Sequence, residues 1–208
     1  KSFSDLNVLA IECEPFPQTE IIGAAPGLPD EAFEHDGQLT KREIRAATLS
    51  ALRPYPGALL WDIGAGCGSV AIEWMRAARG ARAIAIEENA GRVKMIRNNG
   101  KTLGVPELQI LEDRAPEALR DLAQPDAVFI GGGISVEGVF ETAFDALRRG
   151  GILVANAVTV EGEARLIALA KTHHGALSRI AIARAQPVGE FLAFKPFMPV
   201  TMLTIRKA

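Results

Sequence analysis

The sequence is poor in cysteine and aromatic residues, and it has no excess of one charge and no long apolar run. Its 208 residues include two cysteines and 6% aromatic residues, and the formal net charge is −2. Without a basic excess, the charge balance does not favour nucleic acid as a partner. No run of about 18 apolar residues is present, so no membrane span is expected. Cys13 and Cys67 are far apart, which favours a reducing cytoplasm over a disulfide framework.

Histidine is also scarce, and its distribution does not predict a metal site. The three histidines are His35, His173 and His174. The last two fall at the end of a predicted helix, where a cation is favourable. No metal is therefore expected.

The first 30 residues do not follow the pattern of the rest. The chain starts at Lys1 without an initiator methionine or an apolar signal core. Residues 6–12 predict a short buried strand, and the Pro- and Gly-rich residues 13–29 predict a linker. We therefore interpret residues 1–26 as the tail of an upstream domain plus a linker, and residues 27–208 as one domain.

From residue 40 onward, predicted helices and strands alternate. Thr40 followed by Glu43 predicts a capping box at the start of a helix that ends near residue 52, before Pro54. Alternation of this kind is typical of a parallel sheet with helices on both faces. Strands are predicted at 58–62, 83–87, 108–112, 127–130 and 152–156, and helices at 69–79, 90–103, 116–122, 136–147 and 161–172.

The last part of the chain breaks the alternation. Residues 177–183 and 200–205 are both strand-like, with no helix predicted between them, so they are expected to pair antiparallel. A mostly parallel, doubly wound, seven-stranded α/β sheet that ends in an antiparallel pair is typical of class I S-adenosylmethionine-dependent methyltransferases.

A glycine-rich loop follows the first predicted strand and opens a helix. Its residues allow a sharp turn and a close approach of the backbone to a ligand. A dinucleotide-binding loop would have its third glycine at position 69, where this chain has Ser69. The third glycine stands one position earlier, which favours S-adenosylmethionine. The loop residues expected to bind the cofactor are Gly64, Ala65, Gly66, Cys67 and Gly68.

The ends of the next strands supply further candidates. Glu87 closes the second apolar run and is expected to accept both ribose hydroxyls, although Glu88 beside it is an alternative. The backbone N–H of Ala115 is a candidate contact of the adenine. The loop at residues 131–133 should border the methyl donor and the substrate. It lacks the Asp/Asn-Pro-Pro-Tyr/Phe motif of methyltransferases that act on amino nitrogens.

Four stretches of the chain carry a more specific pattern: residues 27–33 (GLPDEAF), 39–45 (LTKREIR), 62–68 (DIGAGCG) and 115–119 (APEAL). In these stretches the chain, from about residue 27, resembles the decarboxylating precorrin methyltransferases of cobalamin biosynthesis, which act at C15 of precorrin-6Y-type substrates. The stretches ahead of the glycine loop are more specific than the loop itself.

The resemblance implies S-adenosylmethionine as the cofactor, bound through Thr40, the glycine loop, Glu87 and Ala115. It also implies methyl transfer to C15 with loss of carbon dioxide from the ring C acetate, fusion to an upstream C5-methylase domain, and a homo-oligomer, possibly a tetramer. An alternative is a class I methyltransferase acting on tRNA or protein, or a non-catalytic module that binds S-adenosylmethionine.

A precorrin carries many carboxylates, which guanidinium and ammonium groups bind well. The aromatic segment 189–199 is expected either to cover the macrocycle or to form a subunit interface. Glu34, His35 or Glu190 is our hypothesis for the proton donor. The basic residues predicted near the substrate are Lys41, Arg42, Arg45, Arg184 and Lys195.

Overall fold

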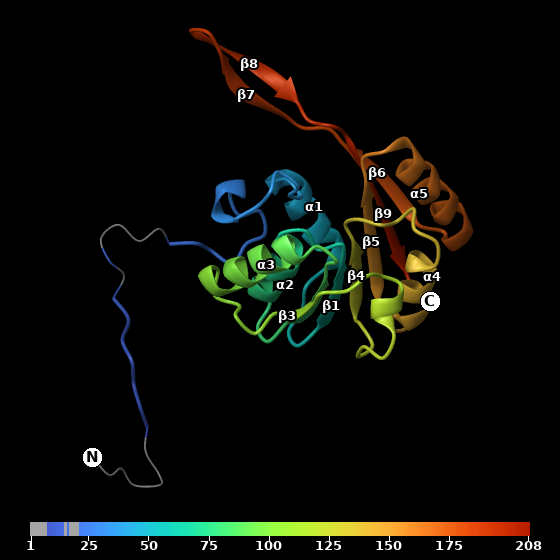
Figure 1. The fold of residues 1–208 in the computed structure, drawn as a ribbon, viewed down its shortest axis with the longest axis horizontal. Helices are drawn as coiled ribbons and strands as arrows, with labels where there is room; N and C mark the ends of the chain where they lie inside the picture. The colour runs from blue at the N-terminus through green and yellow to red at the C-terminus, as the bar shows by residue number, and fades with distance from the viewer. Residues whose placement is uncertain (1–7, 15, 17–20) are drawn as a thin grey trace.

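The computed structural model describes residues 8–14, 16 and 21–208 (Figure 1). Helices and strands alternate along most of this length, as the sequence predicts. The helices are α1 (Arg42–Leu52), α2 (Ser69–Ala77), α3 (Ala90–Thr102), α4 (Val139–Ala146) and α5 (Val160–His173), with short 3-10 turns at Asp30–Ala32 and Glu117–Leu119. The strands are β1 (Leu59–Ile63), β2 (Arg82–Ile86), β3 (Gln109–Leu111), β4 (Ala127–Ile130), β5 (Ile152–Ala157), β6 (Ala176–Ile180), β7 (Ala183–Val188), β8 (Phe191–Pro196) and β9 (Val200–Arg206).

Seven strands form one sheet in the order β3-β2-β1-β4-β5-β9-β6. The first five are parallel to one another, and β9 runs antiparallel to both β5 and β6. The predicted fold class is therefore confirmed. The strand order reverses between β1 and β4, which is the place where open α/β sheets bind ligands.

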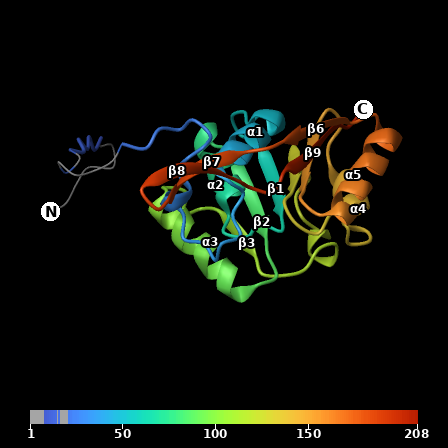
Figure 2. The same ribbon diagram turned by 90° about the horizontal axis from the view of Figure 1, so that it is seen from above.

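Each face of the sheet has its own apolar core. Helices α1, α2 and α3 cover one face, and α4 and α5 cover the other (Figure 2). Neighbouring strand residues alternate between the two cores, so that Leu60 faces the first and Trp61 the second. All five residues of β1 are buried because both faces of the sheet are covered.

Strands β7 and β8 form a separate hairpin that the sequence analysis did not predict. The hairpin projects away from the body of the molecule (Figure 1). Its side chains are mostly exposed, including Phe191 at 79% and Phe194 at 77%. The predicted strand at 177–183 is shorter in the structure, where β6 ends at Ile180 and β7 begins at Ala183.

Two expectations near the N-terminus are wrong. Residues 8–12 are exposed and form no strand, while the rest of the predicted strand at 6–12 lies outside the described residues. Thr40 does not cap α1, because the helix begins at Arg42 and its N-cap, Lys41, makes no side-chain capping bond. A distant carboxylate replaces the predicted cap: Asp30 Oδ1 accepts a hydrogen bond from the Arg42 backbone N–H at 2.9 Å.

Candidate functional site

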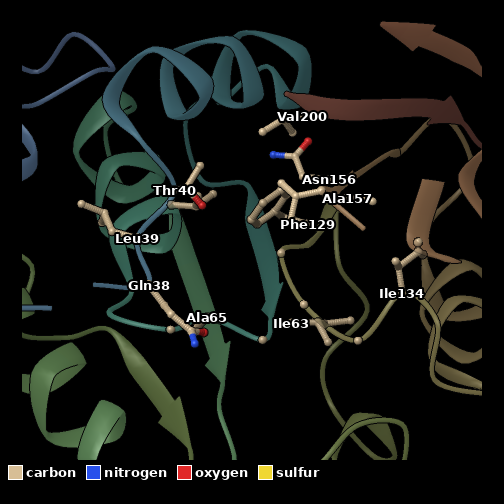
Figure 3. A pocket seen from close by; sticks show the side chains of 18 of the residues that line it. Gln38, Leu39, Thr40, Ile63, Ala65, Phe129, Ile134, Asn156, Ala157 and Val200 are labelled. Carbon is tan, nitrogen blue, oxygen red and sulfur yellow. The ribbon is translucent and has the colours of Figure 1, made fainter. Parts of the chain in front are cut away.

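A cavity of about 840 Å³ opens at the carboxyl ends of the parallel strands (Figure 3). One part is bordered by the glycine loop, the end of β2 and residues 37–40. The other is bordered by the ends of β4 and β5 and by the chain between β8 and β9. The cavity therefore lies at the switch point of the sheet and extends from there toward β5.

The glycine loop forms part of the cavity wall, and two of its glycines stand where a side chain would not fit. A Cβ on Gly64 would lie 2.9 Å from the backbone nitrogen of Gly132 in the β4–α4 loop. A Cβ on Gly68 would lie 2.9 Å from Ile96 Cγ2 of α3, so this glycine serves helix packing. The cavity is lined by Gly64, Ala65, Gly66 and Cys67 but not by Gly68, which the sequence analysis had placed against the cofactor.

Glu87 and Glu88 both line the cavity but have opposite environments. Glu87 is 5% exposed, and its carboxylate accepts hydrogen bonds from the backbone N–H groups of Gly66 at 2.9 Å and Asn89 at 3.1 Å. Glu88 is 66% exposed and lies 3.8 Å from the Arg114 guanidinium. Each carboxylate oxygen has two lone pairs, so Glu87 keeps one acceptor site on each oxygen. It is thus the better-fixed acceptor for a pair of hydroxyls.

Arg92 connects this carboxylate to residues 37–40, a segment on the border of the cavity that we call the strap. Its guanidinium lies 2.8 Å from Asp36 Oδ2 and 3.9 Å from Glu87 Oε1. The hydrogen bond from Arg92 holds the pKa of Asp36 below its ordinary value. Residues 37–40 follow Asp36 directly and line the cavity, so the ion pair holds this strap beside the glycine loop.

Two titratable groups under the glycine loop are buried. Asp62 is fully buried at the end of β1, where its Oδ2 accepts from the Ala71 N–H at 3.0 Å. Burial raises the pKa of Asp62 to about 7, and the charge of Glu87 contributes to this rise. Burial also raises the pKa of the Cys67 thiol, so the nucleophilic thiolate is harder to form at this cysteine.

The second part of the cavity is largely apolar. It is bordered by the side chains of α1, β4, β5 and the chain around β9, several of which are labelled in Figure 3. Asn156 and Thr159 are among the few polar residues there. The lining residues of this apolar lobe include Ile44, Phe129, Ile134, Ala157, Ile180, Ile182, Phe197, Met198 and Val200.

Two further cofactor candidates, Thr40 and Ala115, also line the cavity. Thr40 lies on the strap, across from the glycine loop (Figure 3). The positions of both residues agree with the predicted cofactor site, and their contacts with a cofactor stay a prediction.

Arg45 is not available to a substrate, contrary to the sequence-based expectation. Its side chain is 0% exposed, and its guanidinium pairs with Glu73 and with Asp30. It also donates to the backbone carbonyls of Thr40 and Leu28. The guanidinium thereby links the segment before α1 to α2. Glu73 of α2 strengthens this link, because it also accepts a hydrogen bond from the Leu28 N–H.

The other predicted substrate-binding residues differ in their access to the cavity. Lys41 lines it, and its Nζ lies 5.9 Å from the centroid of the Phe197 ring. Arg184 of β7 is paired with Asp30 and Glu43, and it lies outside the lining. Arg42 and Lys195 are exposed and also lie outside the lining. Only Lys41 of the five thus lies where a bound substrate would contact it.

None of the three proposed proton donors lines this cavity. Glu34 accepts from Asn98 on the surface of α3, and His35 accepts from the Gly37 backbone N–H. Glu190 is exposed in the turn between β7 and β8. Among the residues that the structure describes, no group of three or more His, Cys, Asp or Glu is arranged to hold a metal ion.

Comparison with known proteins identifies the family. Residues 31–207 match the family model described as the precorrin methyltransferase domain. The chain belongs to this family. A precorrin-6Y C(5,15)-methyltransferase (decarboxylating) from Sinorhizobium sp. is 53% identical over 200 residues, which are 94% of this chain and 48% of the relative. A probable cobalt-precorrin-6B C(15)-methyltransferase from Pyrobaculum calidifontis is 33% identical, with 87% of this chain and 96% of the relative covered.

Solved structures agree with the precorrin methyltransferase assignment. The C-terminal domain of precorrin-6Y C5,15-methyltransferase from Rhodobacter capsulatus is 44% identical, with a TM-score of 0.84, covering 89% of this chain and all of that one. An S-adenosylmethionine-dependent O-methyltransferase from Thermotoga maritima, at 17% identity, has a TM-score of 0.68, covers 82% of this chain and 67% of its own, and shares the class I fold. This chain spans about half the length of the longer curated relatives that it matches.

The family and the class I fold together imply a methyl donor of the S-adenosylmethionine type. The residues present fit such a group. The loop leaves open space at Gly66, where a Cβ would meet only the Gln38 carbonyl at 3.6 Å. The buried carboxylate of Glu87 borders the same space.

Of the aromatic segment 189–199, Phe197 and Met198 line the cavity. Among the lining residues that sequence reasoning missed are Arg92 and Asn156. A signal existed for Asn156, because it is a polar residue at the end of the apolar strand predicted at 152–156. Arg92 reaches the cavity through its ion pair with Asp36, a contact between distant segments that no local pattern predicts.

Proposed function

We propose that this domain transfers a methyl group from S-adenosylmethionine to C15 of a precorrin and promotes loss of carbon dioxide from the ring C acetate. One observation carries the proposal: a single cavity extends from Glu87, a fixed acceptor suited to ribose hydroxyls, to a large apolar lobe. The names of the relatives supply the substrate class.

For the cofactor, we assign the ribose hydroxyls to Glu87, the adenine edge to the Ala115 N–H and the methionine end to the loop from Gly64 to Cys67 and to Thr40. All of these residues line the same cavity. S-adenosylmethionine supplies an electrophilic methyl group when it is bound.

The chain's own contribution is positioning and exclusion of water. The apolar lobe, with Phe129 at its inner wall, suits the flat conjugated ring of a tetrapyrrole. Holding the reacting carbon in line with the methyl group can contribute several kcal/mol to the lowering of the barrier. Since the ring itself is electron-rich and can accept the electrons released on decarboxylation, no strong base of the protein is required.

Lys41 is our candidate for holding a substrate carboxylate. It lines the cavity, it lies beside Phe197, and it makes no ion pair with the other described residues. Arg184 also lies near this ring, 5.3 Å from its centroid, but its guanidinium is paired with two carboxylates. A free ammonium next to an apolar lobe matches a flat substrate with charged edges.

We further propose that the domain works as part of a larger assembly. The longer relatives are about twice the length of the matched region, which supports fusion to an upstream C5-methylase domain. The exposed β7–β8 hairpin supports a homo-oligomer, for which the family resemblance implies a tetramer. A cytoplasmic location stays a prediction from cysteine usage. No described helix has the length and apolarity needed to cross a membrane.

Incubation of the purified chain with S-adenosylmethionine and a precorrin-6B-type substrate tests the function. Mass spectrometry should show a product with one added methyl group and one lost carbon dioxide. Calorimetry with S-adenosylhomocysteine and NAD serves as the cofactor control, and only the former should bind. Binding of S-adenosylhomocysteine with no change in any precorrin would contradict the substrate assignment.

A further inference from the structure

Asn156 is a polar residue at a place where the cavity is otherwise apolar. It is the penultimate residue of β5 and lies among Phe129, Ala157 and Val200 (Figure 3). One end of its side-chain amide is fixed, because Nδ2 donates a hydrogen bond of 2.9 Å to Thr48 Oγ1 of α1. Thr48 is itself fully buried, so the amide is held against the protein.

The other end of the amide has no partner. Asn156 Oδ1 is buried and accepts no hydrogen bond from the residues that the structure describes. A buried acceptor left without a donor costs about 1–3 kcal/mol, so nearly all such groups in proteins are paired. Oδ1 is shielded in this structure, but Asn156 lines the cavity, so a turn of its side chain toward the apolar lobe would present this oxygen to a ligand there.

The position of Asn156 in the sheet separates it from the expected cofactor. The glycine loop follows β1, while Asn156 lies two strands away, beyond β4. Neighbouring strands are about 4.8 Å apart, which places the end of β5 roughly 10 Å from that of β1. Asn156 therefore belongs to the part of the cavity that the substrate would occupy.

We propose that Asn156 accepts a hydrogen bond from a ring N–H of the tetrapyrrole substrate. This inference rests on the proposed function. When the methyl group moves to carbon, the C–S bond breaks with its electron pair staying on sulfur, and a π-electron pair of the ring forms the new C–C bond. The single positive charge therefore passes from sulfur to the conjugated ring, where the nitrogens share it. An amide oxygen on an N–H of that ring stabilises the charge as it develops.

The contact should be stronger in the transition state than in the bound substrate, because the N–H becomes more positive as the methyl group arrives. Such a contact affects kcat more than KM. A residue that only supports the fold would instead alter stability or all binding steps together.

The test uses the double variant Asn156→Leu/Thr48→Val, which removes both partners of the existing hydrogen bond and leaves no new unpaired group. Replacing both partners by apolar groups of similar shape is close to neutral for stability. We expect a melting temperature and an affinity for S-adenosylhomocysteine close to those of the wild type. The kcat for methylation should fall roughly 10- to 100-fold, the range of a hydrogen bond to a charged group, with KM changed by less than about threefold.

Two more variants complete the design. Asn156→Asp keeps an acceptor and should retain more of kcat than the leucine variant. Asn98→Leu makes the matching substitution on the exposed face of α3 and should behave as wild type. A double variant with a kcat within about threefold of wild type, or a loss confined to cofactor affinity, would overturn the role of Asn156. Failure of the proposed function is distinguishable, because then the wild-type chain itself leaves the precorrin unchanged.

Discussion

Two adjacent glutamates show how strongly the surroundings of a residue decide its role. Glu87 and Glu88 are both acidic and both border the cavity, yet two backbone N–H groups fix only Glu87. Its carboxylate is held in one orientation before any ligand binds. Binding two hydroxyls there requires little further ordering of the side chain.

Replacing Glu87 by Gln should weaken binding of S-adenosylhomocysteine roughly 10- to 100-fold, since a hydrogen bond to a charged group contributes about 1.5–3 kcal/mol. Glu88→Gln makes the same change on the exposed neighbour and should alter the affinity less than about twofold. Titration calorimetry of both variants measures the difference. A larger loss of affinity in Glu88→Gln than in Glu87→Gln would show that the ribose binds Glu88 instead.

Asp62 is the second residue whose surroundings change its chemistry. Burial raises the pKa of Asp62 from 3.8 to about 7, so the folded protein holds a proton there that the unfolded chain has lost. Between about pH 4 and 7 the unfolded state binds fewer protons at this site, and the free energy of unfolding therefore falls as pH rises. Above pH 7 the effect is constant, because both states are ionised.

Asp62→Asn removes this titration and keeps an acceptor for the Ala71 N–H. The stability of the variant relative to wild type should therefore rise with pH, by up to about 1.4 kcal/mol per unit between pH 4 and 7. Urea denaturation at pH 5, 6, 7 and 8 measures the two free energies of unfolding. Parallel pH curves for the two proteins would show that Asp62 does not titrate in this range.

At the scale of helices and strands, the buried sheet was the predictable part. Strands such as β1 and β4 are covered on both faces, so they appear as short apolar runs between loops. The glycine loop and Glu87 follow from the same pattern, because the position of a strand end sets where its loop begins. The location of the cavity therefore follows from the order of these elements alone, without any tertiary contact.

The start of α1 was predicted wrongly because a distant segment decides it. The local sequence around Thr40 fits a capping box, but Asp30 binds the first free N–H of the helix and Arg45 binds the Thr40 carbonyl. Asp30 also forms ion pairs with the buried Arg45 and with Arg184, so both guanidinium groups already have carboxylate partners. The charge of a residue in the sequence does not show whether its side chain is held in an ion pair or is available to a ligand.

The β7–β8 hairpin was missed for another reason. Pro187 interrupts the short alternation of apolar and polar residues in β7, and β8 begins with four apolar residues and has no alternation. Both faces of the hairpin are exposed in the single chain, so no buried face imposes a pattern. The same exposure bears on how the whole molecule associates with other copies.

At the scale of the whole molecule, an isolated two-stranded hairpin in water is marginally stable unless its apolar side chains are covered. Here Val188, Leu192 and Phe194 are 60–77% exposed, and the hairpin stands away from the body (Figure 1). Its base, in contrast, is anchored, because Arg184 pairs with Asp30 and Glu43. A fixed base with an exposed apolar arm fits an arm that packs on a second copy of this chain.

Leu192→Glu/Phe194→Glu places two charges on one face of the arm, and we expect it to dissociate the proposed oligomer into a smaller species. Light scattering after size-exclusion chromatography measures the mass. Ile167→Glu, on the half-exposed surface of α5, is the matched control and should leave the mass unchanged. The cavity lining does not include β8, so the dissociated variant should still bind S-adenosylhomocysteine. A wild-type chain that is monomeric at micromolar concentration, or a charged variant that keeps the full mass, would contradict this role of the hairpin.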